Sequence, residues 1–109
     1  MSREQQVRQS LLAIEQLLHE QGLWKTQVPE AEAFNSSEPF CVDTMHPLEW
    51  LQWILIPRMQ ALLDSEGPLP KNFAIAPYYD VALESDTPGR LALLVRLKAL
   101  DDLFTDSAN

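Results

Sequence analysis

The chain has 109 residues and a formal net charge of −8, with 46% hydrophobic and 22% charged residues. This composition is typical of a globular chain, which at this length buries about two thirds of its unfolded surface without disulfides or metal ions. Its eight lysines and arginines are dispersed. Because phosphate binding requires clustered basic residues, we expect no direct contact with nucleic acid, and a basic partner is easier to accommodate.

The negative charge is concentrated in the middle of the chain, where Arg58 is the only lysine or arginine between residues 26 and 69. Seven acidic residues share that segment: Glu30, Glu32, Glu38, Asp43, Glu49, Asp64 and Glu66. Cys41 is the only cysteine, so no intrachain disulfide can form. The polar start lacks the apolar core of a signal peptide, and no apolar run is long enough to cross a bilayer. We therefore expect one cytoplasmic domain spanning residues 1–109, with no membrane contact.

The first predicted helix runs from about Arg3 to Gln21. Ser2 and Gln5 fit a capping box at its start, and Gly22 stands where a left-handed residue commonly ends a helix. Its apolar residues recur with the period of an amphipathic helix. These residues are Val7, Leu11, Ile14 and Leu18.

The second predicted helix, Pro47 to Asp64, is apolar almost all round, which is typical of a helix buried at the centre of a fold. Pro57 lies inside it and should kink its axis, because proline lacks an N–H and clashes with the preceding turn. Trp50 and Trp53 are one turn apart, and we expect both to pack in the core. The alternative is that one ring lines a groove for a partner.

Two further helices are predicted, one from Pro77 to about Glu84 and one from Pro88 to about Phe104. Thr87 or Asp86 should cap the last helix. Its apolar stripe consists of Leu93, Leu97, Leu100 and Phe104.

The stretch from Leu23 to His46 has no sustained period, and loops of that length are uncommon inside compact domains. Either it contains a short helical turn around Glu30 to Phe34, or it is an ordered loop pinned by apolar side chains. The absence of glycine and the presence of aromatic residues favour pinning. The pinning residues would be Trp24, Phe34, Phe40, Val42 and Met45.

Several strings in the chain are long and unusual in composition: Phe34-Asn35-Ser36, Pro39-Phe40, Pro47 to Met59 and Phe73 to Tyr79. Through them the chain resembles, over essentially its whole length, the YqcC-like family of small bacterial proteins. The resemblance implies an all-α, up-and-down four-helix bundle. The stretch from Leu23 to His46 would then be a long ordered loop between its first and second helices. It implies no activity, since the family is one of unknown function. Genes of this family often lie beside one for a tRNA pseudouridine synthase, which makes such an enzyme a candidate partner.

Reactive side chains are sparse in the sequence. Cys41, Asp43 and His46 lie close together, but their spacing matches no zinc pattern, and no glycine nearby could shape an oxyanion pocket. Asp101 and Asp102 are adjacent rather than facing, which favours a solvated helix end over a catalytic pair. We therefore expect no metal, no cofactor and no catalytic residue.

Arg58 has two readings. It could pair with a loop acid such as Asp43 or Glu38 and so pin the loop, or it could contact an anion or a partner beside Tyr78. Tyr78 and Tyr79 are adjacent in a helical first turn and point about 100° apart, so one of them should reach the surface.

These patterns predict a non-catalytic protein that binds a protein partner or acts as an accessory factor, with a homodimer as a further option. The main alternative is an enzyme or small-ligand binder with a pocket between the long loop and the kinked second helix. The candidate interaction surface consists of Trp24, Asn35, Asp43, Arg58, Tyr78 and Tyr79.

Overall fold

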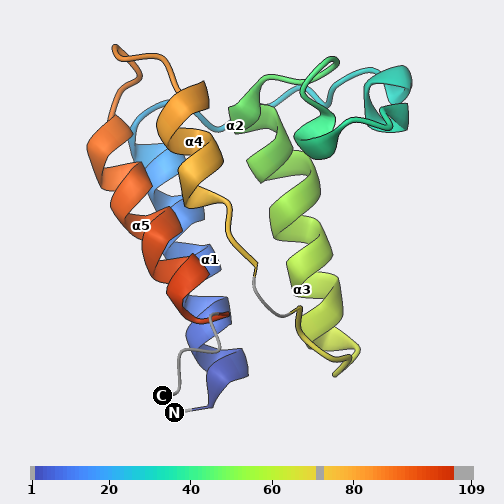
Figure 1. Ribbon diagram of the computed structural model, residues 1–109, viewed down its shortest axis with the longest axis vertical. Helices are drawn as coiled ribbons and strands as arrows, with labels where there is room; N and C mark the ends of the chain where they lie inside the picture. Colours follow the sequence, from blue (N-terminus) through green and yellow to red (C-terminus); the bar gives the residue numbers. More distant parts are fainter. Residues whose placement is uncertain (1, 71–72, 105–109) are drawn as a thin grey trace.

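The computed structural model describes residues 2–70 and 73–104, and every regular element in those ranges is helical. The elements are α1 (Arg3–Glu20), η1 (Ala31–Asn35), η2 (Pro39–Cys41), α2 (Pro47–Trp50), η3 (Leu51–Leu55), α3 (Ile56–Asp64), α4 (Ala76–Ala82) and α5 (Arg90–Asp102). Because α2, η3 and α3 follow one another without a break, they form one continuous rod, called the second helix below. Four rods therefore pack as an up-and-down bundle, which confirms the predicted all-α fold (Figure 1).

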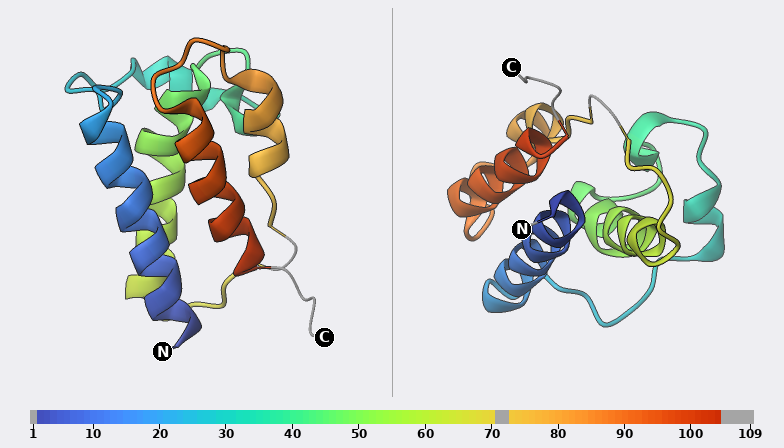
Figure 2. Two further views of the ribbon diagram at one scale, coloured as in Figure 1. Left: turned by 90° about the vertical axis from the view of Figure 1, so that its left-hand side faces the viewer. Right: turned by 90° about the horizontal axis from the view of Figure 1, so that it is seen from below.

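The helix α1 lies at the centre of the arrangement, packed against α5 on one side and against α3 on the other (Figure 2). The η1–η2 segment lies on the far side of the second helix from α1 (Figure 2). The second helix is thus held between α1 and a loop. Among the described helices, none combines the length and the apolar character that a membrane span requires.

The predicted apolar stripes form the main core. The Ser2 hydroxyl accepts the Gln5 N–H at 3.2 Å and so caps α1, while Gly22 takes the left-handed conformation expected after the helix. Every residue of the two predicted stripes is buried: Val7, Leu11, Ile14 and Leu18 at α1, and Leu93, Leu97, Leu100 and Phe104 at α5. Fully burying a side chain of this size contributes about 2 kcal/mol.

The start of α5 differs from the prediction. Pro88 does not open the helix, because Gly89 has a left-handed φ of 68° and the Arg90 N–H bonds to the Thr87 carbonyl at 3.1 Å. Proline followed by a left-handed glycine is the pattern of a type II turn. No side chain caps α5, so neither Thr87 nor Asp86 has the predicted capping role.

Pro57 is accommodated by a π turn. The Ile56 N–H bonds to the Leu51 carbonyl five residues back, and the five residues Leu51–Leu55 form the π element η3, which ends two residues before Pro57. A π turn is a common way to relieve the hydrogen-bond ladder where a helix cannot continue regularly. The second helix therefore continues through Pro57.

Asp101 is buried, which corrects the prediction that the Asp101–Asp102 pair is a solvated helix end. Its carboxylate accepts the Ile75 N–H at 2.9 Å and the Ala76 N–H at 2.8 Å. These donors lie at the first turn of α4, where helix N–H groups have no partner within the helix. Asp101 on α5 thus caps α4, while Asp102 is exposed and pairs with Lys98 at 3.0 Å.

We predict that Asp101→Ala lowers the free energy of unfolding by about 3 kcal/mol, because it leaves two buried N–H donors without a partner. Urea unfolding followed by circular dichroism measures the change. Asp102→Ala is the matched control and should cost about 0.5 kcal/mol or less, since Asp102 is exposed and its pair with Lys98 is an exposed one between residues one helical turn apart. Equal losses for the two variants would contradict the capping role.

Asp101 should also make stability depend on pH. Burial raises the pKa of this carboxyl, and the two backbone donors oppose that shift only in part. The folded state therefore holds the proton on Asp101 more tightly than the unfolded state does. Protonation stabilises the fold fully below the unfolded pKa, near 3.8, and this stabilisation is lost as pH rises through the folded pKa. Relative to Asp101→Asn, the wild type should gain stability as pH falls from about 7 to about 4. If the wild type instead lost stability relative to Asp101→Asn as pH falls, the two backbone N–H donors would lower the pKa of Asp101 more than burial raises it.

Candidate functional site

The long stretch between α1 and the second helix is an ordered cover. It contains the helical turn η1, close to where a turn was considered, and it buries Cys41 and Met45 against Ile54 in a small second core. The Thr44 hydroxyl donates to the Ala33 carbonyl at 2.7 Å and joins the two halves of the cover. The outer face of the second helix is apolar because this cover packs on it.

Phe40 holds the cover to the bundle. Its ring stacks on Tyr78 with centroids 4.1 Å apart and planes 5° apart, and it meets Trp50 edge to face at 4.8 Å. Phe40 and Cys41 both adopt left-handed backbone angles, with φ of 58° and 49°. Residues other than glycine pay about 1 to 2 kcal/mol each for this conformation. The aromatic contacts therefore hold a strained loop in place.

Gln52 ties the other end of the cover to the second helix. Its side chain is buried, accepts the Lys25 N–H at 2.8 Å and donates to the Lys25 carbonyl at 2.7 Å. Both backbone groups of Lys25 are thereby satisfied just after α1 ends. Sequence reasoning missed this contact, although a lone amide side chain in an apolar helix is a signal that a nearby backbone needs a partner.

A pocket of about 320 Å³ lies between the cover and the second helix, in the place predicted for a ligand. Phe34, Phe40, Trp50 and Trp53 line it, and Arg58 stands beside them. The Trp53 indole N–H is buried and has no hydrogen-bond partner among the described residues. Trp50 and Trp53 are half-buried. Trp50 packs against both core clusters, as predicted, from the edge of the core.

The predicted ion pair of Arg58 does not form. Arg58 is exposed and makes no salt bridge with any of the described residues. Asp43 instead accepts a hydrogen bond from the Ser36 hydroxyl, and that hydroxyl also accepts the Glu38 N–H at 3.0 Å. Asp43 and Glu38, the acids expected to pair with Arg58, thus take part in a local turn. Aromatic contacts, not an ion pair, hold the loop to the bundle.

The six residues of the predicted surface do not come together. Tyr79 is fully buried, its hydroxyl donates to the Pro47 carbonyl at 2.6 Å, and burial raises the pKa of that phenol. It therefore cannot belong to a surface. Tyr78 is half-buried beneath Phe40, and Trp24 stacks on His19 at 4.6 Å.

Only three of the six are exposed, namely Asn35, Asp43 and Arg58. Arg58 lines the pocket under the cover, whereas Trp24 lines a separate hollow beside Gln52.

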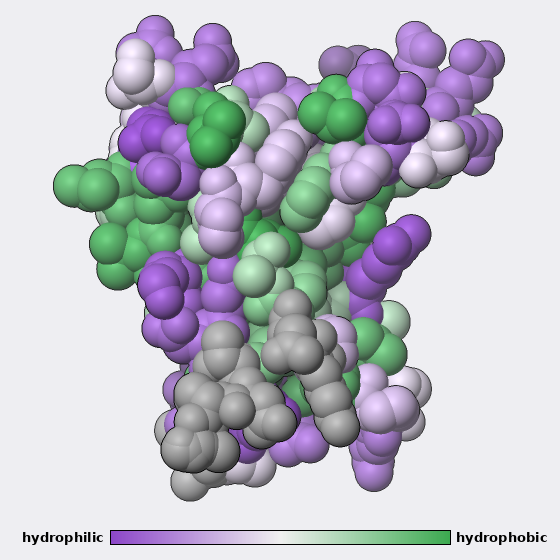
Figure 3. All heavy atoms as spheres, viewed as in Figure 1, coloured by the Kyte–Doolittle hydropathy of each residue, from purple (hydrophilic) through white to green (hydrophobic). Residues whose placement is uncertain are grey.

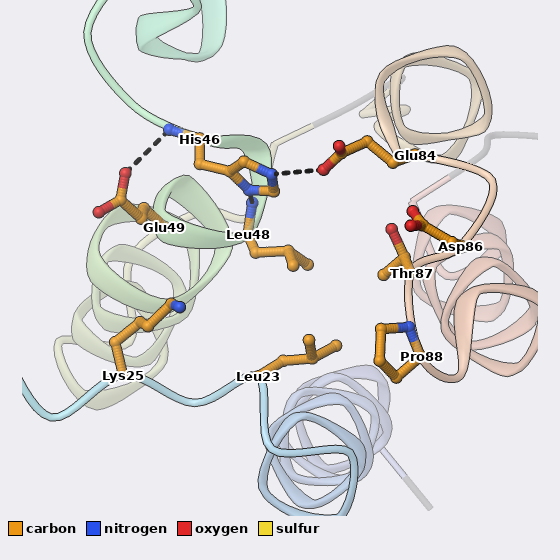
Figure 4. A pocket seen from close by; sticks show the side chains of 9 residues that line it. All are labelled: Leu23, Lys25, His46, Leu48, Glu49, Glu84, Asp86, Thr87 and Pro88. Carbon is orange, nitrogen blue, oxygen red and sulfur yellow. Dashed lines mark hydrogen bonds and ion pairs between the residues drawn. The ribbon is translucent and has the colours of Figure 1, made fainter.

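A third hollow, of about 470 Å³, lies where the start of α2 meets the loop after α4 (Figure 4). His46 caps α2 there: its Nδ1 accepts the Leu48 N–H at 3.1 Å, and the Glu49 carboxylate accepts the His46 N–H at 2.9 Å. The Nε2 atom lies 3.5 Å from the Glu84 carboxylate across the hollow (Figure 4). His46 is thus a structural cap that also bridges two elements.

Cys41, Asp43 and His46 have separate roles, in the small core, a local turn and a helix cap. Within the described ranges, no three histidine, cysteine or acidic side chains are placed to hold a metal ion.

The most exposed large apolar side chains are on α4 and α5, and none of them belongs to the predicted surface. Val81, Leu91 and Val95 have 86%, 75% and 63% of their surface exposed. Leu91 and Val95 line a groove of about 540 Å³. We define this α4–α5 groove by its lining residues, Ala76, Pro77, Asp80, Leu91, Leu94, Val95 and Lys98. Figure 3 shows apolar side chains gathered along the α5 edge of the molecule, and hydrophilic ones over the η1–η2 cover.

These features define a small helical bundle with a loop folded over its second helix and an apolar groove on its last two helices. The chain belongs to the DUF446 family, whose model is described as "tRNA pseudouridine synthase C" and matches residues 6–103. It is 51% identical to the uncharacterized protein YqcC of Escherichia coli strain K12 over the full length of both chains. A solution NMR structure of E. coli YqcC has a TM-score of 0.86 and covers all of this chain and 93% of that one.

Another relative is much longer than this chain. The "tRNA pseudouridine synthase C" of Pectobacterium carotovorum is 54% identical over 90 residues, which are 83% of this chain but 23% of that protein. The similar segment is therefore a minor part of a longer polypeptide.

We predict that Phe40→Gly is more stable than Phe40→Ala by about 0.5 to 1 kcal/mol, because only glycine adopts a φ of 58° without strain. Both variants lose the Phe40 ring and its contacts. The difference between their free energies of unfolding, measured by heat or urea, therefore reports the strain of the backbone at residue 40. Val42, with a φ of −60°, supplies the control: there the alanine variant should be the more stable one. The same order at both positions would argue against a strained cover.

Proposed function

We propose that this protein is a non-catalytic accessory factor that binds a tRNA pseudouridine synthase. The observation that carries the proposal is the long Pectobacterium relative, in which a segment 54% identical to this chain is part of a protein called tRNA pseudouridine synthase C. Two domains that share one chain in one bacterium commonly bind each other when they are separate proteins in another. The description of the family model supports the same partner.

The charge of the chain indicates which component of the reaction it binds. A net charge of −8, with the acids Glu30, Glu32, Glu38 and Asp43 exposed on and around the cover, repels the phosphates of tRNA. An enzyme that binds tRNA needs basic side chains for those phosphates. An acidic chain is therefore attracted to the enzyme and not to its substrate.

A second candidate function is binding of a small anionic ligand in the pocket beneath the cover. Its support is the position of Arg58, which lines a pocket with aromatic walls and has no ion pair with the described residues. Arginine recognises planar anions and stacks on aromatic rings. Under this function Arg58→Gln abolishes ligand binding, whereas under the first function it leaves binding of the synthase unchanged.

The test uses the full chain and the purified tRNA pseudouridine synthase C encoded in the same genome. Isothermal titration calorimetry should show a one-to-one complex, and labelled tRNA titrated with this protein alone should show none at physiological salt. A Kd weaker than about 100 μM for the enzyme would remove the proposal. Micromolar binding of tRNA alone, with a steep salt dependence, would show instead that the chain contacts nucleic acid directly.

A further inference from the structure

We propose that the α4–α5 groove receives the synthase, and that its occupant is an amphipathic helix of that enzyme. This inference rests on the proposed function and adds the surface and the shape of the partner. Two of the three most exposed large apolar side chains among the described residues, Leu91 and Val95 on α5, line this groove. Apolar surface left open in an acidic chain marks an interaction site when it is contiguous.

The geometry of the groove fits a helix. Leu91, Leu94 and Val95 lie three and four residues apart on α5, so they form one stripe along its outer face. Ala76 and Pro77 at the start of α4 give the opposite wall small side chains. A third helix laid along this stripe would pack its own i, i+3, i+4 and i+7 residues against it, as helices do in helix-in-groove recognition.

The net charge of the chain favours a basic partner over a second copy. Two copies of this chain each carry −8 and repel each other as they approach. A tRNA-binding enzyme is attracted by the same field. Inside the groove the charge is balanced, since it is lined by one acid, Asp80, and one base, Lys98. The apolar contact is therefore not opposed at short range, while the acidic cover lies on the other side of the bundle (Figures 1 and 3).

The test compares exposed residues inside and outside the groove. Leu91→Asp and Val95→Asp place a carboxylate in the proposed contact, and each should weaken binding of the purified synthase at least tenfold in calorimetry. Val42→Asp is the matched control, because Val42 is a similarly exposed valine, at 54%, on the cover. It should bind the synthase as the wild type does. Since these side chains are exposed, thermal unfolding should be similar in all three variants, which excludes misfolding as the cause.

The outcomes separate this inference from the function on which it rests. If the wild type does not bind the synthase, the proposed function fails and the groove assignment falls with it. If the wild type binds and Val95→Asp binds equally well, the function stands and the groove assignment is overturned. If sedimentation shows a wild-type dimer and Val95→Asp dissociates it, the groove binds a second copy of this chain. That result would also overturn the assignment of the groove to the synthase. Slower hydrogen exchange of α5 amides in the complex, and unchanged exchange in η1, would support the assignment.

Discussion

The second helix sets the main constraint on this structure, because every residue from 48 to 56 is buried or half-buried, so that this part of the helix needs cover on two sides. α1 supplies one side and the η1–η2 cover supplies the other. The need for that cover explains why the stretch before the helix is ordered, why Phe40 tolerates a left-handed backbone, and why Gln52 satisfies both backbone groups of Lys25. Apolar burial outweighs the local cost of fixing the loop.

The helices were predictable because their signals are local. The period of its apolar residues, the cap at Ser2 and the glycine at Gly22 located α1. The continuous apolar run located the second helix. The features that were missed depend on residues distant in the chain. Asp101 is buried because it meets N–H groups 25 and 26 residues earlier, and no neighbouring sequence records that contact. The π turn was missed because Pro57 indicates only that the hydrogen-bond ladder is interrupted, not how the helix repairs it.

The six residues of the predicted interaction surface are dispersed for a related reason. Aromatic and charged residues such as Trp24, Asp43 and Tyr79 attracted attention by their type, yet the structure uses them in contacts within its own loop and core. The open surface is made of ordinary leucine and valine on α5, whose outer stripe was visible in the spacing of Leu91, Leu94 and Val95. A residue's chemistry indicates what it can bind, but only packing decides whether that capacity is already used within the fold.

The pairing of α1 with α5 joins the first helix of the described chain to the last. Arg3 donates from its guanidinium to the Leu103 carbonyl at 2.6 Å, a contact that spans 100 residues. During synthesis, the second helix can cover one side of α1 before α5 exists. The side of α1 that packs on α5 stays uncovered until α5 has been made, since contacts of such long range form late. The groove between α4 and α5 is completed in the same step. A partner can therefore bind this groove only after α5 has folded onto α4.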